Sequence, residues 1–307
     1  MSNHAAAMHA HRLKDWALLF ALVAMWGSAF MFIKISVGSV PPATIAASRL
    51  AIGAAVLLVV IHARGLRLPR FSGAWGRYAI LAFIGNAAPF YLIAWGQQSI
   101  DSALAGILIA VMPLATLVLA HYFVRGEEIT PARAIGFIFG FLGIGLLTGP
   151  AALTGRSNAG LELVSELAVL GCALCYAANT VIARHSVKSD VLVASACVLL
   201  IASAISIPVA LVVDRPWLLA PDAVSMLSLV WLGMGPTGIA TILYFALVGA
   251  AGPTFMSLVN YISPCVALLL GVAILGEAPG PNAYAALILI LGGIALSQLR
   301  RRPPPIG

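Results

Sequence analysis

The sequence contains very few charged residues. Of its 307 residues, 9% are Asp, Glu, Lys or Arg, against about 25% in an ordinary soluble domain. The apolar share is 62%, and the mean hydropathy is +1.04. Such a chain has too little polar surface to cover a water-soluble core. The composition excludes a soluble enzyme, a disordered chain and a nucleic-acid-binding protein of the usual kind.

Residues that carry chemistry are also scarce. None of the ten acidic residues lies at the centre of an expected span, and the six histidines lie in the N-terminal tail or near helix ends. Metal sites and acid–base catalysis need clustered ligands or titratable pairs. Cys172 and Cys175 form a CxxC inside an expected helix, and we interpret them as small buried hydrophobes. We therefore expect no enzyme activity, no metal and no cofactor.

Long apolar runs recur along the whole chain and predict an all-α polytopic membrane protein. A spanning helix needs about 20 mainly apolar residues, and the loops between the runs are rich in Pro, Gly and charge. The first run is too long for a cleaved signal peptide. The ten expected spans are residues 16–36, 43–61, 77–96, 102–122, 132–149, 163–184, 191–213, 224–247, 253–275 and 282–299.

The basic residues predict the orientation. With the N-terminus in the cytoplasm, Lys34, Arg156 and Arg215 lie outside and Arg49 lies within the second span. The other 13 of the 17 Lys and Arg residues fall on the cytoplasmic side. This positive-inside bias predicts a multi-pass protein of the cell (inner) membrane with both termini cytoplasmic. The basic residues form no patch interleaved with aromatics, so nucleic acid is not an expected partner.

The two halves of the chain match each other at an offset of 150 or 151 residues. Each half has five spans, and because five is odd, the second copy enters the membrane from the opposite side. Inverted repeats are typical of secondary transporters, which hold their substrate near the midplane between the copies. The matched pairs include Trp26 with Tyr176, Lys34 with Arg184, Pro113 with Pro264, and Glu127 with Glu277.

The repeat divides the chain into five parts. They are an N-terminal cytoplasmic tail (1–15), a first repeat (16–149), a linker (150–162), a second repeat (163–299) and a basic C-terminal tail (300–307).

The matched motifs resemble a known family. The first copy has MWGSAFMFIK at 25–34, Arg49-Leu50, Pro113 and GEEITP at 126–131; the second has Ser263-Pro264 and GEAPGP at 276–281. In this order, and doubled, they resemble the EamA-type repeat of the drug/metabolite transporter superfamily, over residues 15–299. The resemblance implies a ten-helix basket around a central cavity, lined by spans 1, 3, 4, 6, 8 and 9, with spans 5 and 10 at the periphery. It also implies export of small metabolites, often amino acids, as in the aromatic amino-acid exporters of this superfamily.

The chain departs from the superfamily in one respect. The small four-helix multidrug relatives carry a glutamate in their first helix, whereas no acidic residue occurs here between Asp15 and Asp101. We therefore expect transport down a substrate gradient, or coupling by a route that the sequence does not show, rather than antiport driven by a membrane carboxylate.

Polar and aromatic residues inside the spans are candidates for the substrate site. Such groups need a partner or a wet cavity in the membrane interior, and a helix–helix hydrogen bond is the alternative for each. Together they suit an amphipathic zwitterion or a flat apolar side chain better than a polyanion. The candidates are Trp26, Ser28, Asn86, Tyr91, Trp95, Tyr176, Asn179, Thr237, Tyr244, Asn260 and Tyr261.

Three residues are candidate hinge or gate positions. Pro113 and Pro264 occupy equivalent places and predict hinges, with a static kink as the alternative. Arg49 is the most costly residue within the spans. It either snorkels or bonds a helix-end carbonyl, or its charge acts on the outer gate or on a substrate carboxylate.

Other charged residues have structural interpretations. We interpret Lys34 and Arg184 as topology anchors, and expect Glu127 and Glu277 to cap the next helix or pair with a nearby base. Gly136 and Gly140 form a GxxxG motif that predicts close packing, within the bundle or between protomers.

The leading prediction is a secondary transporter that exports neutral amino acids or similar small metabolites by alternating access. Its partners are the substrate and membrane lipids, and a single chain suffices. Two alternatives stay open: a multidrug or quaternary-amine exporter of the same fold, and an intramembrane lipid enzyme, which needs a titratable pair that the chain lacks.

Overall fold

The structure is a computed structural model, and it describes residues 12–70, 72–124, 127, 129–153, 159–183 and 190–298. For residues 148–153, 159 and 254 it describes the backbone alone. The expectations for Arg184, Arg156, Gly126, residues 1–11 and the C-terminal tail lie outside the described residues, and α1 begins at Leu13, inside the expected N-terminal tail.

The described chain folds into ten helical rods, one for each expected span, and seven are long and apolar enough to cross a membrane by the described residues alone. The short 3-10 turn η2 (Pro216–Leu218) lies in a loop. Three rods contain more than one segment. The rods are α1 (Leu13–Ser36), α2 (Pro42–Ala63), α3–η1–α4 (Ala74–Ala82, Phe83–Ala87, Ala88–Gly96), α5–α6 (Ser102–Ile109, Met112–Phe123), α7 (Pro131–Leu153), α8 (Ala159–Ala183), α9 (Val191–Val213), α10–η3–α11 (Ala223–Leu232, Gly233–Ile239, Ala240–Met256), α12 (Val259–Leu275) and α13 (Pro281–Ser297).

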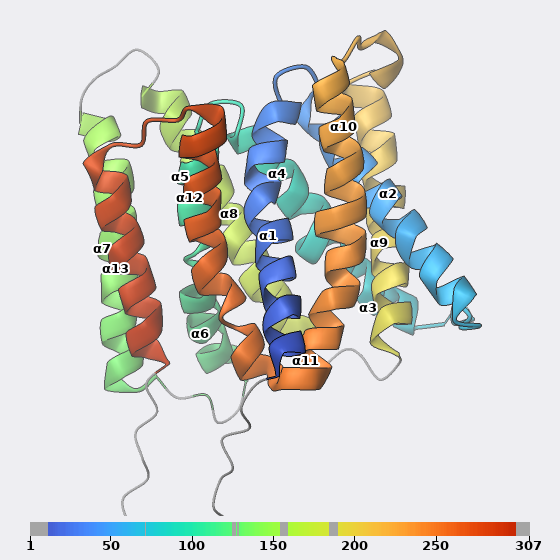
Figure 1. The fold of residues 1–307 in the computed structure, drawn as a ribbon, viewed down its shortest axis with the longest axis horizontal. Coiled ribbons are helices and arrows are strands. Elements are labelled where there is room, and N and C mark those ends of the chain that lie inside the picture. The colour runs from blue at the N-terminus through green and yellow to red at the C-terminus, as the bar shows by residue number, and fades with distance from the viewer. Residues whose placement is uncertain are drawn as a thin grey trace, which may run out of the picture.

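The two five-rod copies are inverted relative to each other. Successive rods alternate in direction, so α1 and α8, the first rods of the two copies, run in opposite directions (Figure 1). We call the end where α1 begins and α13 ends the tail end. The opposite end, with the loops 37–41, 97–101, 214–222 and 276–280, is the Glu277 end.

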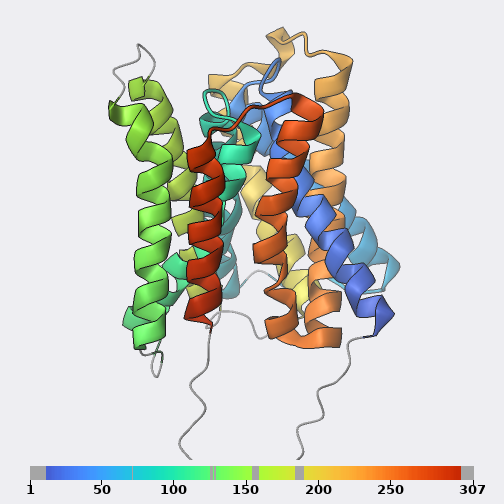
Figure 2. The same ribbon diagram turned by 60° about the vertical axis from the view of Figure 1, so that its left-hand side comes forward.

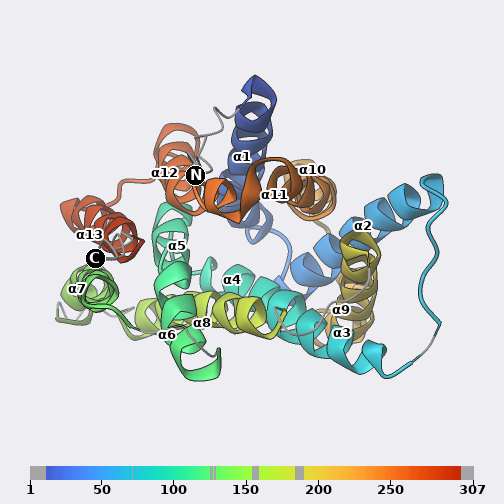
Figure 3. The same ribbon diagram turned by 90° about the horizontal axis from the view of Figure 1, so that it is seen from below.

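The two-fold relation extends to single contacts between α7 and α13, which run side by side at one edge of the bundle (Figures 2 and 3). Gly136 of α7 packs against the Gly293 carbonyl, and Gly143 packs against Ala286 and Ile290. Adding 150 to 136 and 143 gives 286 and 293, so the two contacts are copies of each other. The GxxxG motif therefore serves packing inside the bundle.

The remaining rods form two groups that face each other. Seen along the rods, α12, α1 and α10–α11 lie on one side and α5–α6, α8 and α4 on the other, while α2 and α9 pack together at the edge opposite α7 (Figure 3). In this arrangement the first rod of each copy packs against rods of the other copy: α1 against α12 and α10–α11, and α8 against α4 and α6. The repeat interface thus runs through the middle of the bundle.

Candidate functional site

Two short π-helical segments lie at equivalent places in the two copies. The segment η1 begins at Phe83 and η3 at Gly233, which are 150 residues apart. Each segment has a nearby proline, Pro89 or Pro236, that cannot donate a backbone hydrogen bond. Wide turns of this kind recur at functional sites in helices. The sequence predicts kinks or exposed backbone at these prolines but not π-helix, because proline alone does not specify the turn that replaces the α-helix.

Glycines bring α2 against η3 and so place Arg49 in the interior. A Cβ on Gly53 would lie 2.6 Å from the Thr237 methyl group, and one on Gly238 would lie 2.7 Å from Val56. With the backbones this close, Arg49 Nε donates a hydrogen bond of 2.8 Å to Thr237 Oγ1. The Thr237 hydroxyl donates in turn to the Leu232 carbonyl at 2.8 Å. The side chain is 7% exposed, so Arg49 does not snorkel to the surface.

The guanidinium of Arg49 lies against an aromatic face. Its Cζ lies 3.9 Å from the centroid of the Phe90 ring on α4, which is a favourable cation–π distance. Tyr176 and Cys172 of α8 also lie near the charge. Phe90 and Cys172 are members of this site that we did not anticipate, because an apolar residue in a run of apolar residues carries no distinguishing signal.

Arg49 has more donors than the described residues satisfy. A guanidinium carries five N–H groups, and the hydrogen bond that Arg49 makes to the described residues uses Nε alone. Among the described residues no carboxylate forms an ion pair with Arg49; the ion pair found among them joins Arg133 to Glu127. A positive charge in a membrane interior is costly unless an anion or water compensates it. The four Nη–H groups therefore form a site suited to a carboxylate.

Trp26 connects α1 to the same π segment. Its Nε1 donates to the Pro236 carbonyl at 3.1 Å, and its ring lies 6.0 Å from that of Tyr244. Tyr176, the residue equivalent to Trp26, lies near Arg49. The structure thus brings Trp26, Tyr176, Thr237 and Tyr244 of the predicted set around η3 and Arg49.

Asn179, Asn86 and Ser28 differ in how they are satisfied. Asn179 lies on Gly85 of η1, and its buried Oδ1 has no hydrogen-bond partner among the described residues. The Asn86 side chain donates to its own helix, at Leu81 O, over 3.5 Å, and Ser28 Oγ donates to Met25 O. Asn179 is therefore the member of this group with hydrogen-bonding capacity left for a ligand.

The structure does not connect the remaining candidates to Arg49. Tyr91 is 37% exposed, and Trp95 is half-buried one turn further along α4. Asn260 and Tyr261 lie in the first turn of α12, after a turn at 257–258, rather than at mid-helix. The predicted span begins earlier because the apolar run continues across that turn.

The two proposed hinge prolines have different surroundings. Pro113 is the second residue of α6, directly after the turn at 110–111 that divides the fourth rod. Pro264 lies inside α12, which continues through it. The equivalent prolines thus coincide with a break in one copy and with a continuous helix in the other.

Glu166 lies deeper than the sequence places it. The helix α8 begins at Ala159, four residues before the expected start of the span, which makes Glu166 its eighth residue. The side chain is 3% exposed, and its Oε2 has no hydrogen-bond partner among the described residues. Glu166 therefore lies further inside its helix than the sequence predicts, although not at the centre of the span.

Charged side chains bind helix ends at the Glu277 end. Gly276 ends α12 in the left-handed conformation, φ 68°, which a glycine adopts without strain. The chain then turns so that the Glu277 carboxylate accepts hydrogen bonds from Ser102 N at 2.7 Å and Ala103 N at 2.9 Å. Glu277 therefore caps α5 of the other repeat, not the next helix as expected.

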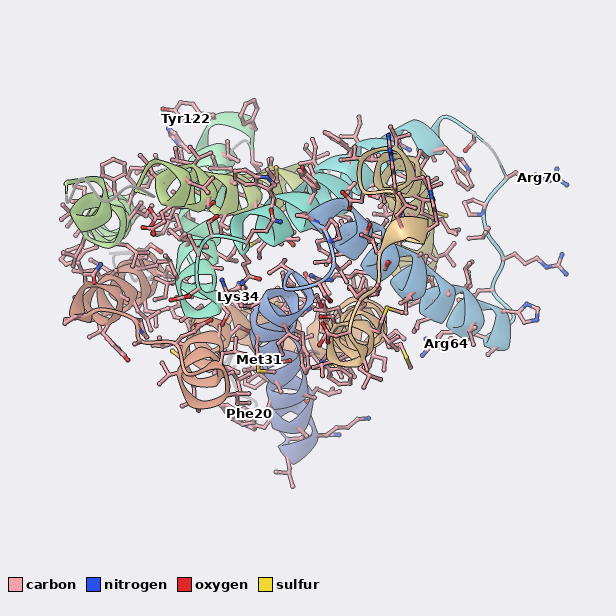
Figure 4. The ribbon with its side chains drawn as sticks, turned by 90° about the horizontal axis from the view of Figure 1, so that it is seen from above. Phe20, Met31, Lys34, Arg64, Arg70 and Tyr122 are labelled. Carbon is pink, nitrogen blue, oxygen red and sulfur yellow. The ribbon has the colours of Figure 1, made fainter. Side chains whose placement is uncertain are left out.

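Lys34 acts at the same end. It points inward from the end of α1, whereas Arg64 and Arg70 are exposed (Figure 4). Its Nζ donates to the carbonyls of Gln97 at 3.0 Å and Ile100 at 2.8 Å, at the carboxyl end of α4. Because helix carboxyl ends carry partial negative charge, Lys34 stabilises α4 there and is more than a topology anchor.

Further side-chain bonds at the Glu277 end join the two repeats. Asp214 Oδ2 accepts from the backbone N of Thr44 at 2.6 Å and from its hydroxyl at 2.9 Å. Ser225 Oγ donates to Ile35 O at 3.2 Å, and Asn282 Nδ2 donates to Leu147 O at 3.4 Å.

Two contacts of Glu127 at the tail end lie within the first repeat. Glu127 pairs with Arg133 at 3.2 Å, as expected for pairing with a nearby base, and His121 Nδ1 lies 2.9 Å from Glu127 O. Across the repeats, the ring of Trp16 lies 5.0 Å from the ring of Phe255, which is an apolar contact.

Two acids in the loops of the Glu277 end titrate differently. Partial burial raises the pKa of Asp101, the nearby Glu277 and Glu162 raise it further, and Lys34 acts the other way. Hydrogen bonds from Ser225 N and from the hydroxyls of Ser39 and Ser225 lower the pKa of Asp222 to about 2.

Comparison with known proteins identifies the family. The model of the EamA-like transporter family matches residues 15–149 and 163–299. The chain belongs to the EamA-like transporter family. It is therefore a multi-pass membrane transporter and not an enzyme, which removes the lipid-enzyme alternative.

Three curated relatives that are named as transporters or exporters match the chain over nearly their full length. The chain is 26% identical over 285 residues to an uncharacterized inner membrane transporter, YedA, of Escherichia coli, covering 92% of this chain and 89% of that protein. It is 26% identical over 286 residues to a probable terminal-alkyne amino-acid exporter of Streptantibioticus cattleyicolor, covering 93% of each. It is 27% identical over 284 residues to the aromatic amino acid exporter YddG of Ancylobacter novellus, covering 92% and 96%.

A solved crystal structure has the same fold. It superposes with a TM-score of 0.66 at 24% identity and covers 94% of this chain and 97% of the other. The two chains thus share the same overall fold.

Proposed function

We propose that this chain exports neutral amino acids, aromatic ones among them, by alternating access. The observation that carries the proposal is the Arg49 guanidinium, which is buried between the repeats with one described hydrogen bond and no described carboxylate. A free amino acid brings a carboxylate of matching geometry, because a guanidinium binds a carboxylate through two parallel N–H groups.

Aromatic side chains around Arg49 suit the rest of such a substrate. The Phe90 ring lies against the guanidinium and Tyr176 lies near it, while Trp26 bonds the Pro236 carbonyl of η3 with its ring 6.0 Å from that of Tyr244. The unsatisfied amide oxygen of Asn179 offers an acceptor to an ammonium group. The positive charge of Arg49 disfavours a quaternary amine, the substrate of the alternative exporter. Two relatives whose names include amino-acid exporter support the same choice.

The tail end is cytoplasmic in this proposal. The exposed Arg64 and Arg70 lie there, in agreement with the positive-inside bias of the whole chain. The protein would lie in the inner membrane, as one relative does by its name, and a single chain holds the complete Arg49 site.

Counterflow in proteoliposomes tests the proposal. Purified protein is reconstituted into liposomes loaded with unlabelled phenylalanine, and entry of radiolabelled phenylalanine, methionine and threonine is measured. We expect saturable entry. Phenylalanine should compete, whereas phenethylamine, which lacks the carboxylate, should not. Absence of saturable entry, or equal competition by phenethylamine, would contradict the proposal.

Variants of Arg49 locate the carboxylate site. Arg49→Met should lower kcat/KM for phenylalanine by about 10- to 100-fold, since a hydrogen bond to a charged group contributes about 1.5–3 kcal/mol. Arg49→Lys keeps the charge, so its kcat/KM should lie between that of the wild type and that of Arg49→Met. Arg64→Met is the matched control, because Arg64 is exposed at the end of α2, and it should transport normally. If Arg49→Met and Arg64→Met transport equally well, Arg49 does not bind substrate.

A further inference from the structure

One carboxyl inside the bundle has no part in the Arg49 site. Glu166 is 3% exposed in the third turn of α8, and no described residue donates a hydrogen bond to its Oε2. An ionisable residue in a spanning helix is expensive, and such residues commonly mark proton or ion pathways. The burial of this carboxyl, with one oxygen unpartnered among the described residues, requires an explanation that packing does not supply.

The charged neighbours of Glu166 are not counterions in contact with it. On its own helix Glu162, one turn earlier, is near enough to interact. Asp101, at the start of α5, is near Glu162, and Lys34, from α1, bonds the carbonyls at the end of α4. The titratable groups of the packed helices α6 and α7, His121, Tyr122 and Arg133, lie at the tail end. No ion pair of Glu166 is found among the described residues.

Uncharged polar groups around Glu166 also have bonding capacity left. A Cβ on Gly96, at the end of α4, would lie 2.9 Å from the Ser165 carbonyl, so α4 and α8 are in close contact there. Ser165 Oγ and both amide atoms of Gln97 are buried and lack described hydrogen-bond partners. Buried polar atoms are nearly always satisfied in a stable interior. Groups left without partners at one helix contact indicate that the contact rearranges, or that protons and water enter it.

The helix α8 connects this carboxyl to the substrate site. Cys172, which lies near the Arg49 charge, is six residues after Glu166, or about 9 Å along the helix. A shift of α8 that exposes Glu166 therefore also moves Tyr176 and Cys172 relative to Arg49. Such a shared rigid element is what coupling between two sites requires.

We propose that Glu166 is a proton-binding carboxyl that couples substrate export to proton entry, an inference that rests on the proposed function. The carboxylate takes one proton from water at the Glu277 end and releases the same proton to water at the tail end. No other reactant is consumed. This is coupling by a route that the sequence does not show, the alternative to transport down a substrate gradient.

Accumulation against a gradient tests the coupling. Proteoliposomes with an interior more acidic by one pH unit receive labelled phenylalanine, with the membrane potential held at zero by valinomycin and potassium. One coupled proton gives about tenfold accumulation for one pH unit. Glu166→Gln should abolish accumulation but keep counterflow when the pH is equal on both sides. Glu166→Asp should retain part of the accumulation. Glu162→Gln, on the same helix, is the matched control and should accumulate like the wild type.

The outcomes separate this inference from the proposed function. Wild-type counterflow without accumulation, or equal accumulation by Glu166→Gln, overturns the role of Glu166 and leaves the exporter proposal standing. Absence of counterflow overturns the exporter proposal. Labelling by dicyclohexylcarbodiimide, which attacks protonated carboxyls in apolar surroundings, then tests Glu166 without any substrate. We expect more modification at Glu166 than at Glu162, increasing as the pH falls; modification that is equal at the two residues, or absent from Glu166, overturns the proposal.

Discussion

The Glu277 end and the tail end are built from equivalent loops of the two repeats, yet they are held together differently. At the Glu277 end, the carboxylates of Glu277 and Asp214 cap helices of the opposite repeat. At the tail end, the described side-chain bonds of Glu127 and His121 stay within the first repeat. The two repeats are therefore joined by different contacts at the two ends: carboxylate caps at the Glu277 end, and the apolar contact of Trp16 with Phe255 at the tail end.

One residue that differs between equivalent positions of the two repeats explains part of the difference between the two ends. Glu277 uses two backbone donors, Ser102 N and Ala103 N. At an offset of 150 or 151, one of the two equivalent positions in the second repeat is Pro253, which has no N–H to donate. The carboxylate of Glu127 would therefore find one donor fewer if it capped the second repeat. We infer that the additional bond favours the cross-repeat cap at the Glu277 end over the equivalent cap by Glu127.

Removing the two glutamates in turn gives the largest expected contrast. Glu277→Ala leaves two backbone donors at the start of α5 without their acceptor and should cost about 3 kcal/mol, since hydrogen bonds to charged groups contribute about 1.5–3 kcal/mol. Glu127→Ala removes a half-exposed ion pair and should cost less than about 1 kcal/mol. Hydrogen exchange of a peptide covering 102–109, together with thermal unfolding in detergent, measures both.

The contrast fails in one clear way. If the two alanine variants lower the unfolding temperature equally, Glu277 and Glu127 contribute equally to stability, and the two ends do not differ in the way inferred above. Faster exchange confined to 102–109 in Glu277→Ala supports it.

Lys34 should give an intermediate effect. Lys34→Met removes two hydrogen bonds from a positive charge at the carboxyl end of α4 and should cost about 1–2 kcal/mol. Lys34→Arg keeps the charge and should lose less stability than Lys34→Met. Thermal unfolding of both variants is compared with that of Arg64→Met, a substitution at an exposed arginine. An unfolding temperature of Lys34→Met that matches Arg64→Met would show that Lys34 only sets topology.

The ten rods and their inverted arrangement are predictable from the sequence because they depend on two robust signals. Apolar length specifies each span, and the odd number of spans per repeat specifies the inversion. The paired motifs at Glu127 and Glu277 are also visible in the sequence. Their different partners are not, because the partners depend on which conformation the packed halves adopt.

The site is only partly predictable for a different reason. Arg49, Thr237 and Tyr176 stand out because polar groups are rare in apolar runs. Phe90 does not stand out, and the burial of Glu166 depends on α8 starting at Ala159, four residues before the apolar run suggests. Which charges lie inside is decided by helix ends, and those are the least predictable feature of a helix.

The smallest effect expected at the Glu277 end is its pH dependence. Because the pKa of Asp101 is raised in the folded protein, its ionised form is less favourable there than in the unfolded chain. The resulting loss of folding stability is absent below the ordinary pKa of 3.8. It grows as the pH rises and is complete above the raised pKa of the folded protein. Asp101→Asn should therefore raise the unfolding temperature at pH 7 and leave it almost unchanged at pH 4. Asp222, with a pKa of about 2, stays ionised in this range, so Asp222→Asn should lower stability equally at both pH values. A pH-independent difference between Asp101→Asn and the wild type would show that the carboxyl of Asp101 is not held in an unfavourable environment, and that Lys34 offsets its acidic neighbours.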